Sequence, residues 1–493
     1  PELRTAVQWD FRWCELRRNG EMERVESAQD KSATTEERAE ASTPPPPPPP
    51  DLVPAGQPIE KGVSLSQSLL WKAQVAFYQQ NGVDSWAKKI VPNYITTNPF
   101  MAEAVAKIAL ANLQDAYLGS LRGGPALAED EYAYIIELGT GAGRLGFFIL
   151  QALRRIRDHL GGKWPILGAK PEICYVMTDV AMENLDFLMS HERLKPYFEL
   201  GWIDCALLDA SKPPERLELL ASGRVISTGT LRNPVLVVAH YVLCAIEQDA
   251  WKVSDSGLVE ESVVTLTSPQ PESRVSPDPE MIKRVDVSFS GVQASDSALD
   301  ARYPHDPAIA NVIREYQELQ RASNGCESTS TTFLIPIAAM RCIEALQRFA
   351  QPGVRVAVLS SDKAFNRFDE FVGFDDYPIS VEGSLSFMAN HDAIIRWCRH
   401  RGGGAIYSEA LASTMADACL LSALFIPVLG GVPGESLDDL QMLRMCFKEH
   451  LSDYGAADHY NIAHVISTTD TDAPKPNKPK KPNKPKKPNK PKK

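Results

Sequence analysis

Three glycines at every second position, Gly139, Gly141 and Gly143, are the residues whose spacing most directly suggests chemistry. They follow a short apolar run that ends near the carboxylate Glu137, and they precede a segment with helical apolar periodicity, residues 144–150. Only glycine lets the backbone approach a ligand this closely, and a helix N-terminus favours negatively charged groups. The pattern therefore predicts a strand, a tight turn and a helix that together form a cradle for a nucleotide.

This pattern resembles the first motif of methyltransferases that depend on S-adenosylmethionine (SAM). It also fits G-x-G-x-x-G, the fingerprint of dinucleotide-binding folds, at Gly141, Gly143 and Gly146. Two details favour SAM over NAD. Glu137 suits the positively charged methionine part of SAM, whereas it would repel a pyrophosphate. The next acidic strand end, Asp179, lies about twice as far from the first glycine as the roughly 20 residues that the dinucleotide fingerprint expects.

Composition limits the class of protein. The chain has 493 residues, of which 44% are hydrophobic and 23% charged, as in a folded protein with a large core. The net charge is −11, and the last 20 residues carry ten lysines and no acid, so the rest of the chain has a charge of about −21. A body this acidic is a poor binder of nucleic acid, because phosphate contact depends on basic patches. Only the Lys-rich tail is suited to weak contact with a polyanion.

Nine cysteines are scattered from Cys14 to Cys446 without a C-x-x-C pair, which argues against a disulfide framework and against a metal site. They favour a reducing compartment, so we expect an intracellular protein, either cytoplasmic or mitochondrial. The longest mainly apolar run, 418–430, is too short for a membrane span, so no membrane partner is expected. The chain begins with Pro1 rather than methionine, so an N-terminal targeting segment could be missing.

Low-complexity segments define the expected domains. Residues 1–62 mix charged and small residues around seven consecutive prolines, 44–50, which favour extended polyproline conformation and are predicted to be disordered. The tail, 466–493, repeats Asn-Lys-Pro-Lys-Lys-Pro, and its like charges and prolines prevent packing. Residues 253–325 are rich in Ser, Pro, Asp and Glu and are expected to be a disordered insertion. One folded domain is therefore predicted over 63–465.

Between these ends, apolar runs alternate with helix-like segments, which indicates a mostly parallel sheet covered by helices on both faces. The expected strands are residues 134–137, 173–178, 235–240, 354–360, 405–408 and 420–427. The expected helices are residues 71–80, 101–117, 144–159, 182–190, 241–248 and 331–349. The resemblance to SAM-dependent methyltransferases implies their class I fold, an α/β Rossmann-like architecture with a mostly parallel seven-stranded sheet, here preceded by N-terminal helices. In such sheets ligands bind at the carboxyl ends of the strands, where the strand order reverses.

Acidic residues follow further strands. Asp179 ends the second expected strand, where a carboxylate can accept hydrogen bonds from both ribose hydroxyls of a nucleoside. It is equally suited to act as the N-cap of the helix that follows. Asp204 and Asp209 lie near the end of another strand, where an acid could accept a hydrogen bond from the adenine amino group. The sequence does not separate these two, and Asp204 is the one we assign to the cofactor.

Four segments together resemble the MidA-type methyltransferases, which include a mitochondrial complex I assembly factor. Residues 233–249 (NPVLVVAHYVLCAIEQD) are similar to the family's strand ending in Asn-Glu, followed by two aromatic residues and Asp-Ala-Leu-Pro. Residues 93–102 (NYITTNPFMA) resemble the mouth of its SAM pocket, which implies that Thr96 binds the cofactor. Residues 359–365 and 383–391 resemble a later strand and a small-residue segment on the substrate side.

This likeness covers about residues 65–465. It implies a SAM-dependent methyltransferase that modifies a protein side-chain nitrogen such as that of arginine. Two alternatives remain open: a catalytically silent SAM-fold scaffold or assembly factor, and an NAD-binding oxidoreductase.

The chain departs from the family pattern at two positions. The family's Asn at the end of this strand is His240 here, and its downstream Asp is Cys244. A histidine titrates near neutral pH and can act as a base, so His240 is the expected catalytic residue, with Glu247 and Asp249 supplying negative charge. His240 and Cys244 are also compatible with purely structural roles, which is what the silent-scaffold alternative assumes.

Overall fold

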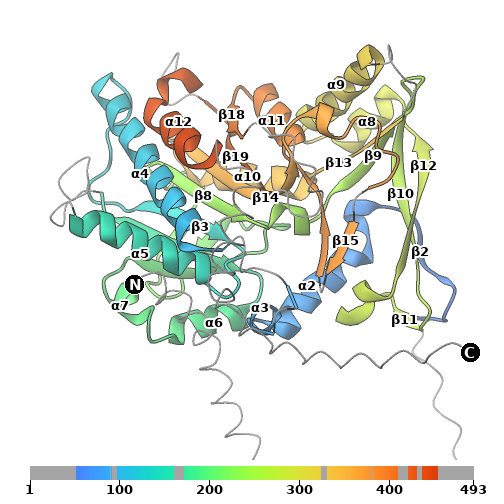
Figure 1. The fold of residues 1–493 in the computed structure, drawn as a ribbon, viewed down its shortest axis with the longest axis horizontal. Coiled ribbons are helices and arrows are strands. Elements are labelled where there is room, and N and C mark those ends of the chain that lie inside the picture. The colour runs from blue at the N-terminus through green and yellow to red at the C-terminus, as the bar shows by residue number, and fades with distance from the viewer. Residues whose placement is uncertain are drawn as a thin grey trace, which may run out of the picture.

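The computed structural model describes residues 51–88, 90–91, 97–159, 171–323, 330–377, 379–382, 384–408, 420–429 and 436–452. Two β-sheets lie side by side, and most of the helices pack around the larger one (Figure 1). None of the described helices is long and apolar enough to cross a membrane.

The larger, central sheet has eight strands. They are β3 (Ala133–Leu138), β4 (Ile173–Asp179), β5 (Ile203–Leu207), β8 (Val235–His240), β14 (Val356–Phe365), β17 (Ala389–Asn390), β18 (Gly404–Tyr407) and β19 (Leu420–Ile426). Seven of them follow the order β18-β19-β14-β8-β3-β4-β5, and β17 pairs with the end of β14. All pairs from β5 to β14 are parallel, whereas β19 runs antiparallel to both β14 and β18. The expected mixed α/β architecture is confirmed.

Helices cover both faces of this sheet because alternate residues of its buried strands point to opposite sides. Ile135 and Leu236 face one layer, and their neighbours Ile136 and Val237 face the other. The first layer is α4 (Pro99–Leu121), α5 (Arg144–His159) and α12 (Gln441–Phe447), and the second is α9 (Pro307–Ser323), α10 (Ile337–Phe349) and α11 (His391–His400). Helix α6 (Met182–Ser190) follows β4.

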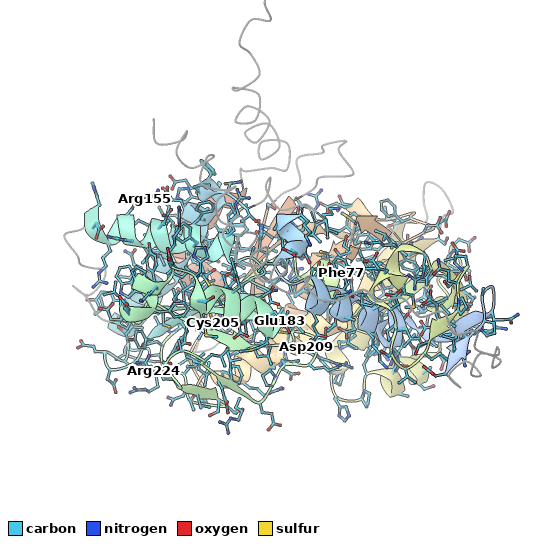
Figure 2. The ribbon with its side chains drawn as sticks, turned by 90° about the horizontal axis from the view of Figure 1, so that it is seen from below. Phe77, Arg155, Glu183, Cys205, Asp209 and Arg224 are labelled. Carbon is cyan, nitrogen blue, oxygen red and sulfur yellow. The ribbon has the colours of Figure 1, made fainter. Side chains whose placement is uncertain are left out.

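The second sheet is antiparallel, and the chain enters it shortly after the carboxyl end of β8. Its strands are β2 (Pro58–Ser64), β9 (Asp249–Val253), β10 (Val259–Thr267), β12 (Asp286–Gln293) and β13 (Thr331–Ile335). Helix α2 (Leu69–Asn81) packs against it and against the hairpin of β15 (Ile379–Glu382) and β16 (Ser384–Phe387). The carboxamide of Gln74 in α2 both donates to the carbonyl of Leu385 (2.6 Å) and accepts from its N–H (2.9 Å). Seen from below, α2 with Phe77 and α6 with Glu183 lie on the same side of the molecule (Figure 2).

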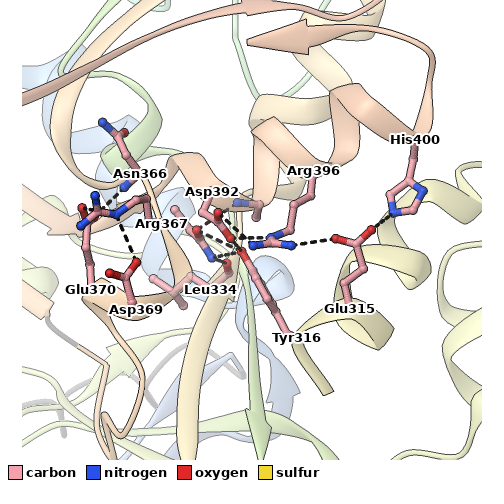
Figure 3. A network of polar contacts seen from close by, with 12 residues as sticks. Glu315, Tyr316, Leu334, Asn366, Arg367, Asp369, Glu370, Asp392, Arg396 and His400 are labelled. Carbon is pink, nitrogen blue, oxygen red and sulfur yellow. Dashed lines mark hydrogen bonds and ion pairs between the residues drawn. The ribbon is translucent and has the colours of Figure 1, made fainter. Parts of the chain in front are cut away.

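A chain of polar contacts and ion pairs joins α9 to α11 (Figure 3). Arg396 lies between Asp392 (2.7 Å) and Glu315 (2.9 Å), and Glu315 also contacts Nε2 of His400 (2.7 Å). The hydroxyl of Tyr316 donates to Asp392 at 2.9 Å. Asp392 and Tyr316 are buried, and these hydrogen bonds offset the cost of burying their polar groups.

The expectation that residues 253–325 are disordered is wrong. The described part of this range, 253–323, forms β10 and β12, together with α8 (Asp296–Arg302), α9 and the short strand β11 (Glu272–Ser273). The composition was misleading because β10 alternates polar residues with a buried apolar face that includes Val264 and Leu266. The folded region also starts earlier than residue 63, since β1 (Leu52–Val53) and most of β2 precede it. The segments 1–50 and 466–493 lie outside the described residues.

Two expected helices also differ. Residues 241–248 contain only a single 3₁₀ turn, η2 (Leu243–Ala245), because Tyr241 adopts a left-handed φ of +56° that an α-helix cannot contain. Residues 331–349 divide into strand β13 and helix α10, with Pro336 between them. Proline cannot sit inside a helix without breaking it, so the helix begins after it.

Candidate functional site

The glycine turn lies at the carboxyl end of β3, where the strand order reverses. From β3 the sheet continues through β4 and β5 on one side and through β8 and β14 on the other. Gly139, Gly141 and Gly143 have φ values of +59°, +55° and +68°, in the region that L side chains rarely adopt. The turn is held by the N–H of Thr140 donating to the carbonyl of Thr178 at 2.8 Å. The expected strand, turn and helix are all present, at the edge where α/β sheets bind ligands.

Asp179 at the end of β4 organises this turn. Its carboxylate accepts from the N–H of Gly141 (2.8 Å), from the N–H of Ala181 (2.9 Å) and from the Asn184 carboxamide (3.1 Å). Burial raises the pKa of Asp179, although these donors act in the opposite direction. The N-cap of α6 is Ala181, so Asp179 is not itself the cap that the sequence offered as an alternative. Its role in ribose binding remains a prediction.

Glu137 lies beneath the turn rather than in front of it. It is 3% exposed, and the hydroxyl of Thr140 donates to its carboxylate at 2.7 Å. A Cβ at Gly146, the first-turn glycine of α5, would come within 2.8 Å of the same carboxylate. Burial raises the pKa of Glu137 to about 7, so a large fraction is uncharged near neutral pH. The expected pairing with a cationic ligand therefore depends on the ligand stabilising the ionised form.

Three apolar side chains pack against the turn so closely that a Cβ on each of its glycines would meet one of them. A Cβ placed on Gly141 would lie 2.7 Å from the indole ring of Trp86, in the short helix α3 (Asp84–Ala87). The corresponding atom on Gly139 would lie 3.0 Å from Val242. On Gly143 it would clash with Leu188 of α6. The turn thus touches α3, α6 and the segment after β8.

Trp86 in turn stacks on Tyr78 of α2, with ring centroids 5.8 Å apart and an interplanar angle of 18°. The Tyr78 hydroxyl donates to Oγ of Ser384 in β16 at 3.0 Å. Burial raises the pKa of Tyr78 to about 12, and the nearby Cys244 and Asp179 add to this effect. The N-terminal helices therefore contribute two aromatic residues to the site, which the sequence did not indicate.

The end of β8 forms the other wall. His240 and Tyr241 have their rings 5.3 Å apart at an angle of 74°. Tyr241 is the only non-glycine residue with positive φ in the described part of the chain, and its N–H donates to the carbonyl of Ser361 at 2.9 Å. Strained residues of this kind occur preferentially at functional sites. The strain turns the chain so that Val242 reaches Gly139.

Cys244 and Asp362 form a buried pair behind this wall. The backbone N–H of Cys244 donates to Asp362 at 3.0 Å, and that of Lys363 donates at 2.8 Å. Burial raises the pKa of Asp362 to about 6 and that of the Cys244 thiol well above its ordinary value. Cys244 is therefore a neutral thiol that packs against the carboxylate of Asp362.

Several expected site residues lie elsewhere or serve the fold. Asp204 accepts from the backbone N–H of Cys205 (2.8 Å), Ala221 (2.8 Å) and Ser222 (3.1 Å), near the start of β5 rather than at its carboxyl end. Both oxygens of Asp204 are thus used to hold the loop that follows β6. Its role towards adenine stays a prediction, as does that of Asp209, which accepts from the N–H of Ser211.

Asp249 belongs to the second sheet. It is fully buried and accepts from Arg302 (2.9 Å) and from the Tyr303 hydroxyl (2.9 Å). Glu247, two residues earlier, is partly buried, and its carbonyl accepts from the N–H of Ala338. Thr96 lies outside the described residues. Within the described ranges, no three His, Cys, Asp or Glu residues lie close enough together to hold a metal ion.

No family model matches the chain, and no curated protein matches it. Among solved structures, it is similar to a "likely methyl transferase" from Burkholderia thailandensis bound to S-adenosylhomocysteine, with 12% identity over 75% of this chain and 89% of that chain and a TM-score of 0.42. An uncharacterised member of the same superfamily from that organism is 13% identical over 75% and 94%, with a TM-score of 0.37.

A third structure is the 1,6-didemethyltoxoflavin-N1-methyltransferase of the same organism, with 1,6-didemethyltoxoflavin and S-adenosylhomocysteine bound. It is 8% identical over 77% of this chain and 95% of that chain, with a TM-score of 0.31. At these identities and TM-scores, the likeness assigns neither a family nor a ligand to this chain.

Proposed function

We propose that the chain is a SAM-dependent methyltransferase of the Rossmann-like class I type. The observation that carries the proposal is the turn of Gly139, Gly141 and Gly143, which follows the first parallel strand and lies at the reversal of the order β5-β4-β3-β8-β14. This is the 3-2-1-4-5 order of doubly wound nucleotide-binding sheets, and their ligands bind at that crevice.

The residues around the turn are of the types that SAM needs. Glycine backbone at positive φ allows close approach, Asp179 lies at the tip of the neighbouring strand for the ribose, and Glu137 lies under the turn with a carboxylate. The turn has no room for SAM in this structure, because the indole ring of Trp86 lies against Gly141. Binding therefore requires the indole ring to move, while the backbone and the acids can stay as they are.

When bound, SAM supplies an electrophilic methyl group on a positively charged sulfur. The chain's own task is then to align an acceptor and to take up the proton that it releases. His240 lies at the end of β8, one residue from the strained Tyr241, and a neutral imidazole can accept a proton. We propose a protein side-chain nitrogen such as that of arginine as the acceptor, in line with the resemblance to MidA-type enzymes.

A catalytically silent scaffold is the second candidate. Two observations favour it: Trp86 closes the cradle over Gly141, and the position of the family's downstream Asp holds Cys244, a neutral buried thiol. Such a chain would keep the SAM fold without transferring a methyl group.

Radiolabelled methyl transfer from SAM to protein in a cell extract separates the two candidates. The enzyme proposal predicts that the full chain adds label to protein, that acid hydrolysis of the labelled band releases methylarginine, and that His240→Ala loses most of the activity. Lys448→Ala is the control, because this exposed residue belongs to the C-terminal helical segment Lys448–Ser452 and not to the turn or to β8. SAM binding without any label transfer would support the scaffold instead.

A further inference from the structure

The contact between Trp86 and Gly141 is too close to admit a ligand between them. A Cβ built on Gly141 would lie 2.7 Å, 2.8 Å and 3.1 Å from Cη2, Cζ2 and Cζ3 of the indole. Carbon atoms pack best at about 3.5–4.0 Å, so the ring edge already occupies the space directly in front of the glycine backbone. Any nucleoside held by this turn must take the place of the six-membered ring of Trp86.

Helix α3, which carries Trp86, is weakly secured. It has four residues, and its N-cap, Val83, offers no side-chain hydrogen bond. The ion pair between Lys88 and Asp84 (2.9 Å) is partly exposed to solvent. Ser85 is fully buried, yet its hydroxyl has no hydrogen-bond partner among the described residues. A buried hydroxyl without a partner costs free energy, which lowers the cost of moving α3 out of its docked position.

One face of the indole ring is covered by a second aromatic side chain. Trp86 stacks on Tyr78, which is itself anchored to Ser384 through its hydroxyl. If Trp86 leaves, the face of Tyr78 on which the indole stacks is uncovered, and aromatic faces attract both flat bases and cations. The flat base of a nucleoside can therefore replace the contacts that the indole gives up.

We propose that Trp86 is an internal competitor for the cofactor, which closes the glycine cradle until the nucleoside displaces it. This inference rests on the proposed function, because it names SAM as the displacing ligand. A protein that binds only in its open form has an apparent dissociation constant equal to the intrinsic one divided by the open fraction. Removing the indole should therefore tighten binding, which is the opposite of what a residue that contacts the ligand would do.

The test is calorimetric titration of the full chain with S-adenosylhomocysteine. Trp86→Ala is expected to bind about ten-fold more tightly than the unmodified chain, since it needs no opening step. Trp202→Ala is the matched control, a partly buried tryptophan that packs on Tyr197 and Arg157 away from the turn, and it should leave the affinity unchanged.

Fluorine NMR gives a readout that does not depend on affinity. In the full chain labelled with 5-fluorotryptophan, the resonance missing from Trp86→Ala belongs to Trp86, and S-adenosylhomocysteine is expected to shift it to the position of an exposed indole. Equal or weaker binding by Trp86→Ala, with an unshifted resonance, would overturn the competitor role and leave SAM binding intact. Failure of both proteins to bind would overturn the proposed function together with this inference.

Discussion

The carboxylate of Asp179 accepts a hydrogen bond from the backbone N–H of Gly141 at 2.8 Å. This contact ties the tip of β4 to the turn after β3, so the shape of the cradle does not depend on a ligand. The same carboxylate also accepts hydrogen bonds from the backbone N–H of Ala181 and from the carboxamide of Asn184. Asp179 therefore sets the conformation of the turn as well as the start of the segment leading into α6.

Asp179→Asn should lower both stability and cofactor affinity. The amide can place only one acceptor oxygen where the carboxylate has two, which leaves a buried N–H of Gly141 or Ala181 without a partner and costs about 1–3 kcal/mol. Denaturant unfolding measures the loss, and titration with S-adenosylhomocysteine measures the affinity. Asp186→Asn, an exposed acid on α6, is the control and should change neither. An Asp179→Asn protein as stable as the parent would show that the turn is held by other contacts.

Gly143→Ala is expected to cost more than Gly223→Ala. Both glycines have nearly the same φ, +68° and +71°, so an alanine should cause about the same backbone strain at either position. A Cβ at Gly143 would clash with the side chain of Leu188, whereas nothing lies within 4 Å of one at Gly223. The difference in unfolding free energy should be about 1–3 kcal/mol, the usual cost of overpacking. Equal losses in the two variants would mean that α6 moves away from the turn at no cost.

The burial of Glu137 predicts a specific pH dependence. Its pKa rises from an ordinary value of 4.5 to about 7, so the folded protein keeps a proton that the unfolded chain releases. Stability from this group is fully present below pH 4.5 and is lost as the pH rises through about 7. Glu137→Gln removes this loss, so its stability relative to the parent should increase across that window by up to about 3 kcal/mol.

Thermal unfolding of both proteins between pH 4 and pH 8 measures this difference. The contribution of Asp362, whose pKa is also raised, is common to both and cancels. A difference that stays constant with pH would show that Glu137 is ionised in the fold.

Asp249→Asn should destabilise the second sheet without a selective effect on methyl transfer. It weakens the buried contacts with Arg302 and Tyr303, and loss of one partner of a buried ion pair costs on the order of 3 kcal/mol. Asp286→Asn on the exposed strand β12 is the control. If Asp249→Asn kept its melting temperature and lost activity, the catalytic role expected from the sequence would be restored.

The sequence predicted β3, β4 and β8 well because each is a mainly apolar run with a polar residue at or near its end, as at Asp179 and His240. Such signals are local and survive in the fold. The Trp86–Gly141 contact was not predictable, because it joins a short N-terminal helix to a turn through tertiary packing alone. The same holds for Tyr78 and Ser384, which meet although they lie far apart in the chain.

Composition was the least reliable guide. Residues 253–325 look like a linker by their Ser, Pro, Asp and Glu content, but β10 buries Val264 and Leu266 at alternating positions. A strand with one face exposed to solvent needs apolar residues only at alternate positions, so a low apolar fraction does not imply disorder. Similarly, Asp249 follows the end of β8 closely in sequence, but the chain has already turned into the second sheet.

The most direct test of the central claim is calorimetric titration of the purified full chain with S-adenosylhomocysteine and, separately, with NADH. The glycine turn at the reversal of strand order predicts saturable binding of one S-adenosylhomocysteine per chain and no heat with NADH. Binding of NADH alone, or no binding of S-adenosylhomocysteine even by Trp86→Ala, would contradict the assignment of this turn to SAM.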